Sequence, residues 1–232
     1  MHAHIVPDID DGSTNLYMSM ELIKNAYAQG VRHIVCTSHS FGKMMSYNRN
    51  FKILDEQVKK ENIPISLYTG CEIDCSHSTI DSVVKRLDNK IIPTINNTRY
   101  VLIEFSPYED AEQIIDCVRK LQNFDYKPVL AHIERYQDLF DNDKRINSLV
   151  EAGCLFQINA FSLQDERNIN VKLRARYLLS MGLASFIGSD AHRVNHRTYS
   201  IQNGIEYVYK NCQKDYADAI CYKNATKVFN IY

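Results

Sequence analysis

Residues 127–132 have the sequence KPVLAH, a short and mainly apolar run that ends on His132. A run of this length and composition is typical of a strand buried in a parallel sheet. A helical pattern precedes it at 112–123, and another follows at 143–152 and stops before Gly153, a common signal for the end of a helix. A strand between two helices predicts one strand-and-helix unit of a parallel sheet.

The same unit repeats along the whole chain. Further strand-like runs are HIV (4–6), RHIVCT (32–37), ISLYTG (65–70), YVLIEF (100–105), CLFQIN (154–159) and LASFIG (183–188). Further helical patterns lie at 13–29, 51–61 and 171–181. Seven strand-then-helix units predict a parallel sheet, and closure of that sheet is the economical arrangement. We therefore expect a single-domain α/β barrel over residues 1–232.

Composition excludes several classes of protein. The 232 residues carry a formal net charge of −1, so the chain lacks the basic balance of a non-specific nucleic-acid binder. It has no apolar run of membrane-spanning length, and its first residues, MHAHIVPDIDDG, do not resemble a secretory signal. Seven cysteines, an odd number without a CxxC pair, argue against a disulfide framework. We expect a soluble cytoplasmic protein with no nucleic-acid partner and no membrane span.

Titratable side chains lie on the first predicted strand and near the points where the later predicted strands end. The set comprises His2, His4, Asp11, His39, Glu72, Glu104, His132, Asp190 and His192. The carboxyl ends of the strands of a parallel barrel share one rim, where active sites are built. Imidazole and carboxylate ligands suit Zn²⁺, Mn²⁺ or Fe²⁺, and a set without cysteine is unlike a structural zinc cluster. The sequence thus predicts a metal site at this rim.

A structural explanation is available for each of these residues taken singly. A single histidine is more often a hydrogen-bonded structural residue than a metal ligand. The HxH spacing of His2 and His4 is weak evidence for a metal site, because this pattern also arises by chance. Jointly the set is hard to explain that way, because many buried titratable groups would each need separate partners. We assign structural or surface roles to His33, His77, His196 and Glu134.

The motifs also resemble a known family. The stretches HAHIVPDIDDG, QGV, TSHS, GCEI, IPTINNTRYVLIEFS, PVLAHIERY and GSDAH, spread over residues 2–192, resemble the polymerase-and-histidinol-phosphatase (PHP) superfamily. Within it they are most similar to the manganese-dependent tyrosine phosphatases of bacterial capsule and exopolysaccharide operons, the CpsB/CapC-like family. The resemblance implies a distorted (β/α)7 barrel similar to a TIM barrel (the PHP fold). Met1 directly precedes His2, so we expect a short first strand.

The resemblance further implies three divalent metal ions, with Mn²⁺ as the first choice and Fe²⁺, Zn²⁺ or Mg²⁺ as alternatives. One ion would take His2, His4, Glu72 and Asp190. A second would share Glu72 and take Glu104 and His132, and a third would take Asp11, His39 and His192. Arg135 matches a family arginine that faces the phosphate, and Arg197 is a second candidate for that role.

The expected reaction is in-line attack of metal-bound hydroxide on a phosphomonoester, without a covalent phosphoenzyme. No cysteine is followed six residues later by an arginine, so the mechanism of cysteine-based tyrosine phosphatases is excluded. The resemblance implies that the substrate is a phosphotyrosine protein, namely the autophosphorylated tail of a bacterial tyrosine kinase that controls capsule synthesis. It is compatible with a homo-oligomer. The alternatives are a small-molecule phosphatase acting on a compound such as histidinol phosphate, and a non-catalytic phosphotyrosine-binding regulator. The charge balance disfavours a DNA exonuclease.

Overall fold

The strands of the protein pair in parallel throughout, in a computed structural model that describes residues 1–231. One sheet contains β1 (His33–Cys36) and β2 (Ser66–Thr69). The other has the order β3 (Glu72–Asp74), β4 (Tyr100–Glu104), β5 (Lys127–Leu130), β6 (Leu155–Asn159) and β7 (Phe186–Gly188). Strand order therefore follows chain order, as expected when each connection returns over the outside of a barrel.

Single-residue bridges join the two sheets on both sides. Ala3 pairs in parallel with Cys36 at the end of β1 and with Ala191 just beyond β7. His39, beyond β1, pairs in parallel with Glu72 in β3. These bridges complete a ring of backbone pairing, so the predicted α/β barrel is confirmed. At the bridges the regular β-ladders of the barrel are interrupted.

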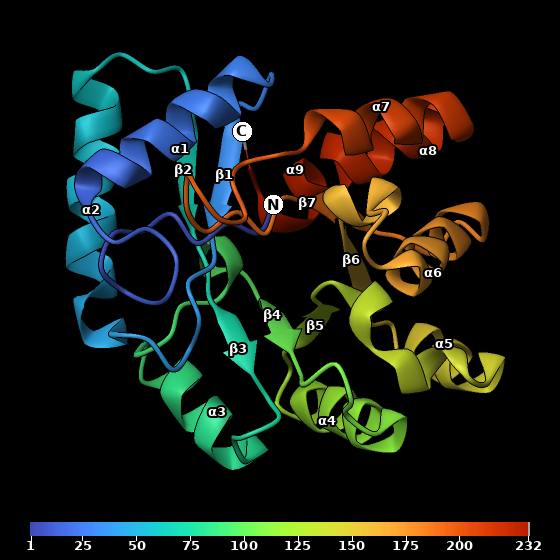
Figure 1. Cartoon of the computed structure of the whole chain (residues 1–232). Helices are drawn as coiled ribbons and strands as arrows, with labels where there is room; N and C mark the ends of the chain where they lie inside the picture. The colour runs from blue at the N-terminus through green and yellow to red at the C-terminus, as the bar shows by residue number, and fades with distance from the viewer. Residues whose placement is uncertain (232) are drawn as a thin grey trace.

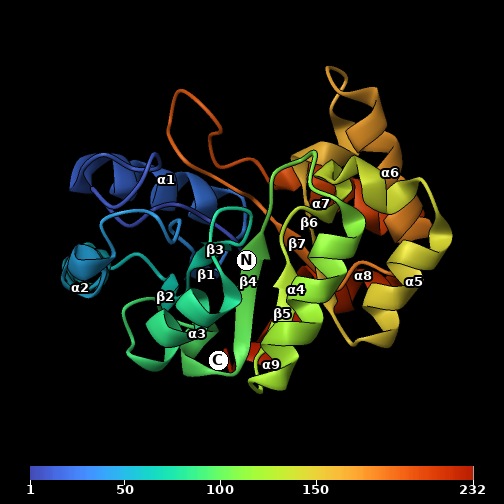
Figure 2. The ribbon, with the colours of Figure 1, turned by 90° about the horizontal axis from the view of Figure 1, so that it is seen from below.

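The helices form the outer layer of this ring (Figure 1). They are α1 (Leu16–Ala28), α2 (Met44–Lys60), α3 (Ile80–Asp88), α4 (Ala111–Asn123), α5 (Asp143–Glu151), α6 (Ile169–Ser180), α7 (Gln202–Asn211), α8 (Lys214–Asp218) and α9 (Asn224–Phe229). Figure 2 shows α1 and α2 on one side of the strands and α5 and α6 on the other. Local capping sets several starts: Asn15 accepts from the backbone N–H of Met18, and Asp110 accepts from that of Glu112.

One strand prediction is wrong, and one strand was not predicted. Residues 4–6 do not form a regular strand, because the His4 carbonyl accepts from the backbone N–H of Ser13 in the following loop. The predicted strand at 65–70 corresponds to β2, but a further strand, β3, begins at Glu72 after a break at Gly70 and Cys71, so Glu72 lies within a strand of its own. At this break the Gly70 N–H donates to the Tyr47 hydroxyl, a side chain from α2.

Helix boundaries also differ from the prediction. The helix expected at 51–61 begins earlier, at Met44. Helix α3 and the C-terminal helices α7 to α9 were not among the predicted elements. The C-terminal segment fills the end of the barrel opposite the site described below: the Phe229 ring lies 4.9 Å from the Phe186 ring and 5.5 Å from the Tyr100 ring. Its aromatic packing closes that end, which leaves the other rim for polar side chains.

Among residues 1–231 we find no helix that combines the length and the apolar composition of a membrane span. All seven cysteines, which lie between positions 36 and 221, are free thiols. Burial raises the pKa of most of them, for example that of Cys154 and Cys221, each to about 12. These thiols are therefore protonated at neutral pH and behave as small apolar side chains.

Candidate metal centre

The side chains proposed as metal ligands lie together at one rim of the barrel. Their ligand atoms form three groups, each with all its atoms within 4.8 Å of one another: His2, His4, Glu72 and Asp190; His39, Glu72 and Glu104; and His4, Asp11, His39 and His192. His132 lies beside the second group, with Nε2 at 2.9 Å from Glu72 Oε1 and 3.7 Å from Glu104 Oε2. The first group matches the first expected ligand set, while His4 also joins Asp11, His39 and His192.

Glu72 occupies the middle of the cluster and is 1% exposed. Its Oε1 lies 3.1 Å from His2 Nε2, and its Oε2 lies 3.1 Å from His4 Nε2 and 3.2 Å from His39 Nδ1. Burial by itself raises the pKa of this carboxyl, but the electrostatic attraction of His2 and the hydrogen bonds with His132, His2 and His4 outweigh it and hold the pKa well below its usual range. Glu72 is therefore a buried carboxylate with nitrogen atoms around both oxygens, as a bridging ligand requires.

In four of the clustered histidines Nδ1 contacts an atom that we do not propose as a metal ligand, whereas His39 Nδ1 lies 2.6 Å from Glu104 Oε1. His2 Nδ1 lies 2.9 Å from Gln157 Oε1, and His4 Nδ1 lies 2.8 Å from Asp10 Oδ2. His132 Nδ1 lies 3.3 Å from the Tyr136 hydroxyl, and His192 Nδ1 lies 2.9 Å from the Asp190 carbonyl oxygen. Contacts of this kind fix the ring orientation of metal-binding histidines and leave Nε2 for the metal. The donor set therefore fits divalent transition metals, since it offers imidazole nitrogens and carboxylate oxygens without thiolate.

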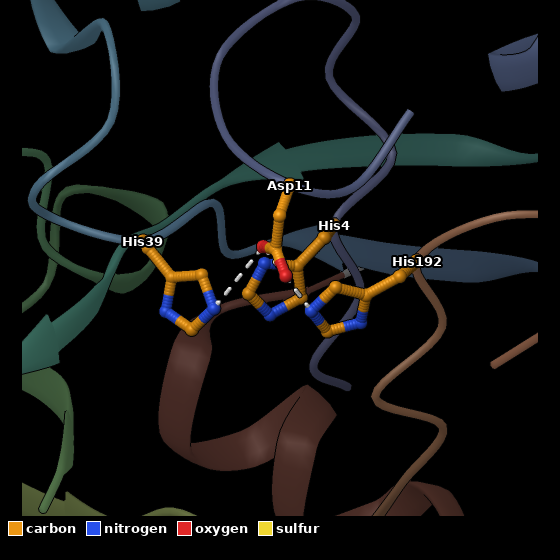
Figure 3. Close-up of side chains that lie close together, drawn as sticks. All are labelled: His4, Asp11, His39 and His192. Atoms are coloured by element: carbon orange, nitrogen blue, oxygen red, sulfur yellow. Dashed lines mark ion pairs between the residues drawn. The ribbon is translucent and has the colours of Figure 1, made fainter. Parts of the chain in front are cut away.

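Asp11 projects between two histidines at the open edge of the cluster (Figure 3). Its Oδ1 lies 3.5 Å from His39 Nε2 and 3.6 Å from His192 Nε2. The His192 ring stacks on the His4 ring, with centroids 3.9 Å apart. Asp11 is 62% exposed, so this group lies nearest to solvent and faces an incoming ligand.

Three of the clustered residues have left-handed backbone conformations. The φ angles are 64° at His2, 32° at His132 and 52° at Asp190. A non-glycine residue in this region costs roughly 1–3 kcal/mol, and such strain concentrates at functional sites. The barrel therefore holds these side chains in positions that a relaxed backbone would not give them.

Both candidate phosphate-binding arginines border the cluster. Arg135 follows β5 in a single turn of 3₁₀ helix (Ile133–Arg135), and its Nη2 donates to Asp190 Oδ2 at 2.6 Å. Burial lowers the pKa of Arg135, but the charge of Asp190 more than offsets this and raises it. Arg197 is more exposed and places Nη1 3.4 Å from His192 Nε2. Glu134 Oε1 accepts from the backbone N–H of Asn159, and its buried Oε2 has no hydrogen-bond partner among residues 1–231, so Glu134 does not pair with Arg135.

Several residues that orient the cluster were missed in the sequence. Gln157 Oε1 accepts from the backbone N–H of His132 and contacts His2, while Gln157 Nε2 donates to Asn159 Oδ1. Asn159 Nδ2 in turn donates to Asp190 Oδ2 at 3.1 Å. Gln157 and Asn159 are polar residues at alternate positions of an otherwise apolar strand, which places both side chains on one face of the sheet. This pattern could have identified them from the sequence. No role was predicted for Asp10, which precedes Asp11 in the same loop.

The histidines left out of the site lie apart from it. His33 begins β1 and contacts the Tyr68 hydroxyl, and His77 is exposed beside Asp74. His196 is exposed in the loop after β7. His33 and His77 serve as controls in the experiments below.

Asp10 provides a test of the orienting contacts. One Asp10 oxygen accepts from His4 Nδ1 and from the backbone N–H of His39, and the other accepts from the N–H of Gly12. An amide in place of the carboxylate must turn its NH₂ group toward one of these donors. We therefore expect Asp10→Asn to bind Mn²⁺ about 10- to 100-fold more weakly in a chelator-competition titration.

The matched control is Asp8→Asn in the same loop, because the Asp8 side chain is exposed and pairs with Lys43. This variant should bind Mn²⁺ as the parent protein does. An Asp10→Asn protein with parent affinity would show that the Asp10 contacts do not prepare the site.

A parallel barrel with clustered histidines and carboxylates at one rim defines the class of metal-binding α/β-barrel proteins. Solved structures of low identity share this fold, among them a phosphotriesterase homology protein from Escherichia coli (13% identity, TM-score 0.63, covering 97% of this chain and 97% of that chain). Within the class, the chain belongs to the CpsB/CapC family of capsular polysaccharide synthesis, whose model matches residues 1–230. This confirms the resemblance predicted from the motifs.

Similar proteins carry consistent names. The chain is 34% identical to the tyrosine-protein phosphatase CpsB of Streptococcus pneumoniae, covering 98% of this chain and 96% of that protein. It is 31% identical to the tyrosine-protein phosphatase YwqE of Bacillus subtilis over 88% of this chain and 81% of that protein. A solved structure from work on YwqE and CpsB, described as unique metal-dependent tyrosine phosphatases, has a TM-score of 0.83 at 28% identity and covers 93% of this chain and 88% of that chain.

Proposed function

We propose that the protein is a metal-dependent phosphomonoesterase that acts on phosphotyrosine in proteins. The observation that carries this proposal is the buried Glu72 carboxylate surrounded by histidines, with the Arg135 guanidinium bordering the same cluster. Its relatives in the CpsB/CapC family are named tyrosine-protein phosphatases. The substrate we infer is the phosphorylated tail of a bacterial tyrosine kinase that controls capsule or exopolysaccharide synthesis. The free thiols suit a reducing compartment, so we place this reaction in the cytoplasm.

We infer three divalent ions, with Mn²⁺ as the first candidate. His2, His4, Glu72 and Asp190 would hold one, Glu72, Glu104 and His132 a second, and Asp11, His39 and His192 a third. His4 and His39 each lie within reach of a neighbouring group as well. When bound, such ions supply a nucleophile from water at neutral pH and compensate charge on the transferring phosphoryl group.

The protein's own residues bind and orient the substrate. The Arg135 guanidinium is a planar fork that suits two phosphate oxygens, and it is held at the cluster by Asp190. Arg197 offers a second, more exposed cation beside His192. Burial of the histidines and Glu72 keeps bulk water from the inner part of the site, which strengthens charge interactions with a bound phosphate.

Activity is expected to follow metal content and not thiol chemistry. The described cysteines lie outside the three ligand groups, and the Cys71 thiol next to Glu72 is buried with a raised pKa. EDTA should therefore abolish phosphate release from p-nitrophenyl phosphate, and Mn²⁺ should restore it. Iodoacetamide, with labelling followed by mass spectrometry, should leave the rate unchanged. Loss of turnover on alkylation at full metal occupancy would count heavily against this chemistry.

The competing functions are separated by substrate. A phosphotyrosine peptide should be hydrolysed with a higher kcat/KM than histidinol phosphate, whereas the reverse order would indicate a small-molecule phosphatase. Binding of the peptide without phosphate release by the Mn²⁺-loaded protein would indicate a non-catalytic regulator. The same assays with His33→Ala and His77→Ala should give parent values, because both side chains lie away from the cluster.

A further inference from the structure

An exposed aromatic side chain adjoins the cluster. The Phe41 ring lies against the His39 ring, with centroids 4.6 Å apart and an interplanar angle of 17°. Phe41 is nevertheless 64% exposed, so the fold covers only part of its surface. An exposed phenyl group contributes little to folding, since the hydrophobic gain scales with the apolar area removed from water. Its remaining surface is available to a ligand.

The backbone on both sides of Phe41 is fixed by hydrogen bonds. Ser40 N–H donates to the Glu72 carbonyl, and Gly42 N–H donates to the His39 carbonyl. The next residue, Lys43, donates its N–H to the Ile9 carbonyl. A Cβ atom at position 42 would lie 2.6 Å from that same Ile9 oxygen, so the close approach of the two segments requires glycine. Phe41 is therefore held in place before any ligand binds, which lowers the cost of ordering a contact.

Phe41 and Arg197 lie on different sides of Asp11. Asp11 stands between His39 and His192 at the exposed edge (Figure 3). Phe41 adjoins His39, whereas Arg197 adjoins His192. A phosphate ester bound with its phosphoryl group at the cluster and the arginines would thus have an apolar, planar surface next to its organic group.

We propose that Phe41 is a specificity-determining residue that stacks on the ring of an aryl phosphate. The inference rests on the proposed phosphatase function and deepens it, because it gives a physical reason for choosing phosphotyrosine over alkyl phosphates. Aromatic pairs prefer offset-stacked or edge-to-face contacts, which add attraction beyond the apolar area that they bury. Loss of the phenyl group should weaken aryl ligands and leave alkyl ligands nearly unaffected.

The test compares two inhibitors with the same head group. Phenylphosphonate and ethylphosphonate are titrated calorimetrically into the Mn²⁺-loaded parent, Phe41→Ala and Phe41→Trp proteins, with metal content measured on each. Phe41→Ala should bind phenylphosphonate about 5- to 10-fold more weakly, while ethylphosphonate binding changes less than about twofold. Phe41→Trp should bind phenylphosphonate at least as tightly as the parent does.

Phe124→Ala is the matched control. Phe124 is also an exposed phenylalanine, but it follows α4 just before β5 begins, at the end of the barrel away from the cluster. Its replacement should change neither affinity.

Equal weakening of both phosphonates in Phe41→Ala would overturn the proposal, because it would show that Phe41 acts through His39. Unchanged phenylphosphonate binding in Phe41→Ala would also overturn the proposal. A parent protein that binds phenylphosphonate no more tightly than ethylphosphonate would overturn it as well. Hydrolysis of a phosphotyrosine peptide by the parent is measured separately. Its absence would overturn the proposed function, whereas the inhibitor comparison still decides the role of Phe41.

Discussion

Replacing Glu72 with alanine is expected to lower the metal content of the protein and to reduce kcat/KM on a phosphotyrosine peptide by at least about 10³-fold. The physical reason is the position of this carboxylate. Its two oxygens lie within 2.9–3.2 Å of nitrogen atoms from His2, His4, His39 and His132. Among residues 1–231 no other carboxylate lies within 4.0 Å of all four histidines, so the loss of Glu72 should affect more than one ion.

Glu72→Gln extends the test, because it keeps the volume of the side chain and removes only its charge. Both variants are compared with the parent by metal analysis, circular dichroism and steady-state kinetics on the same preparations. Glutamine should lose metal as alanine does, while both proteins keep their secondary structure. A folded Glu72→Ala protein that hydrolyses the peptide at the parent rate would show that the central carboxylate has been wrongly assigned.

Arg135→Ala should fold and keep its metals but lose about 10²–10³-fold in kcat/KM, the range for one well-placed charge-stabilising donor. The Arg135 guanidinium already lies at the cluster through Asp190, and its other nitrogens can bind phosphoryl oxygens. Arg135→Lys should recover only part of the loss, because an ammonium group lacks the bidentate geometry of the guanidinium. Inhibition by inorganic phosphate should weaken in parallel.

A second arginine–aspartate pair serves as the matched control. Arg99 Nη2 lies 2.7 Å from Asp125 Oδ2, and both residues are exposed beside the amino ends of β4 and β5. Arg99→Ala should retain parent kinetics. If metal-replete Arg135→Ala also showed near-parent kcat/KM and phosphate inhibition, Arg135 would be a structural partner of Asp190 and not a phosphate ligand.

Much of the fold follows from local sequence patterns. Short apolar runs between amphipathic helices predicted the parallel barrel, and the runs at 100–105, 127–132 and 154–159 correspond closely to β4, β5 and β6. Each of these signals depends on residues close together in the chain, since strand and helix periodicity are local properties. The pattern failed at residues 4–6, where the His4 carbonyl bonds to the Ser13 N–H, and it did not predict β3 as a strand separate from β2, where the Gly70 N–H bonds to the Tyr47 hydroxyl.

The candidate site, like the fold, could be predicted from the sequence only in part. The sequence by itself determined which residue types stand where strands end, and therefore the chemistry of the ligands proposed there. Only the tertiary structure decided that His4 reaches two ligand groups, that Gln157 and Asp10 orient histidines, and that Phe41 lies exposed beside His39. The physical reason is that these contacts join segments far apart in the chain. The distances between their side chains depend on strand register and on the left-handed backbone of a few residues, and no local sequence pattern encodes either.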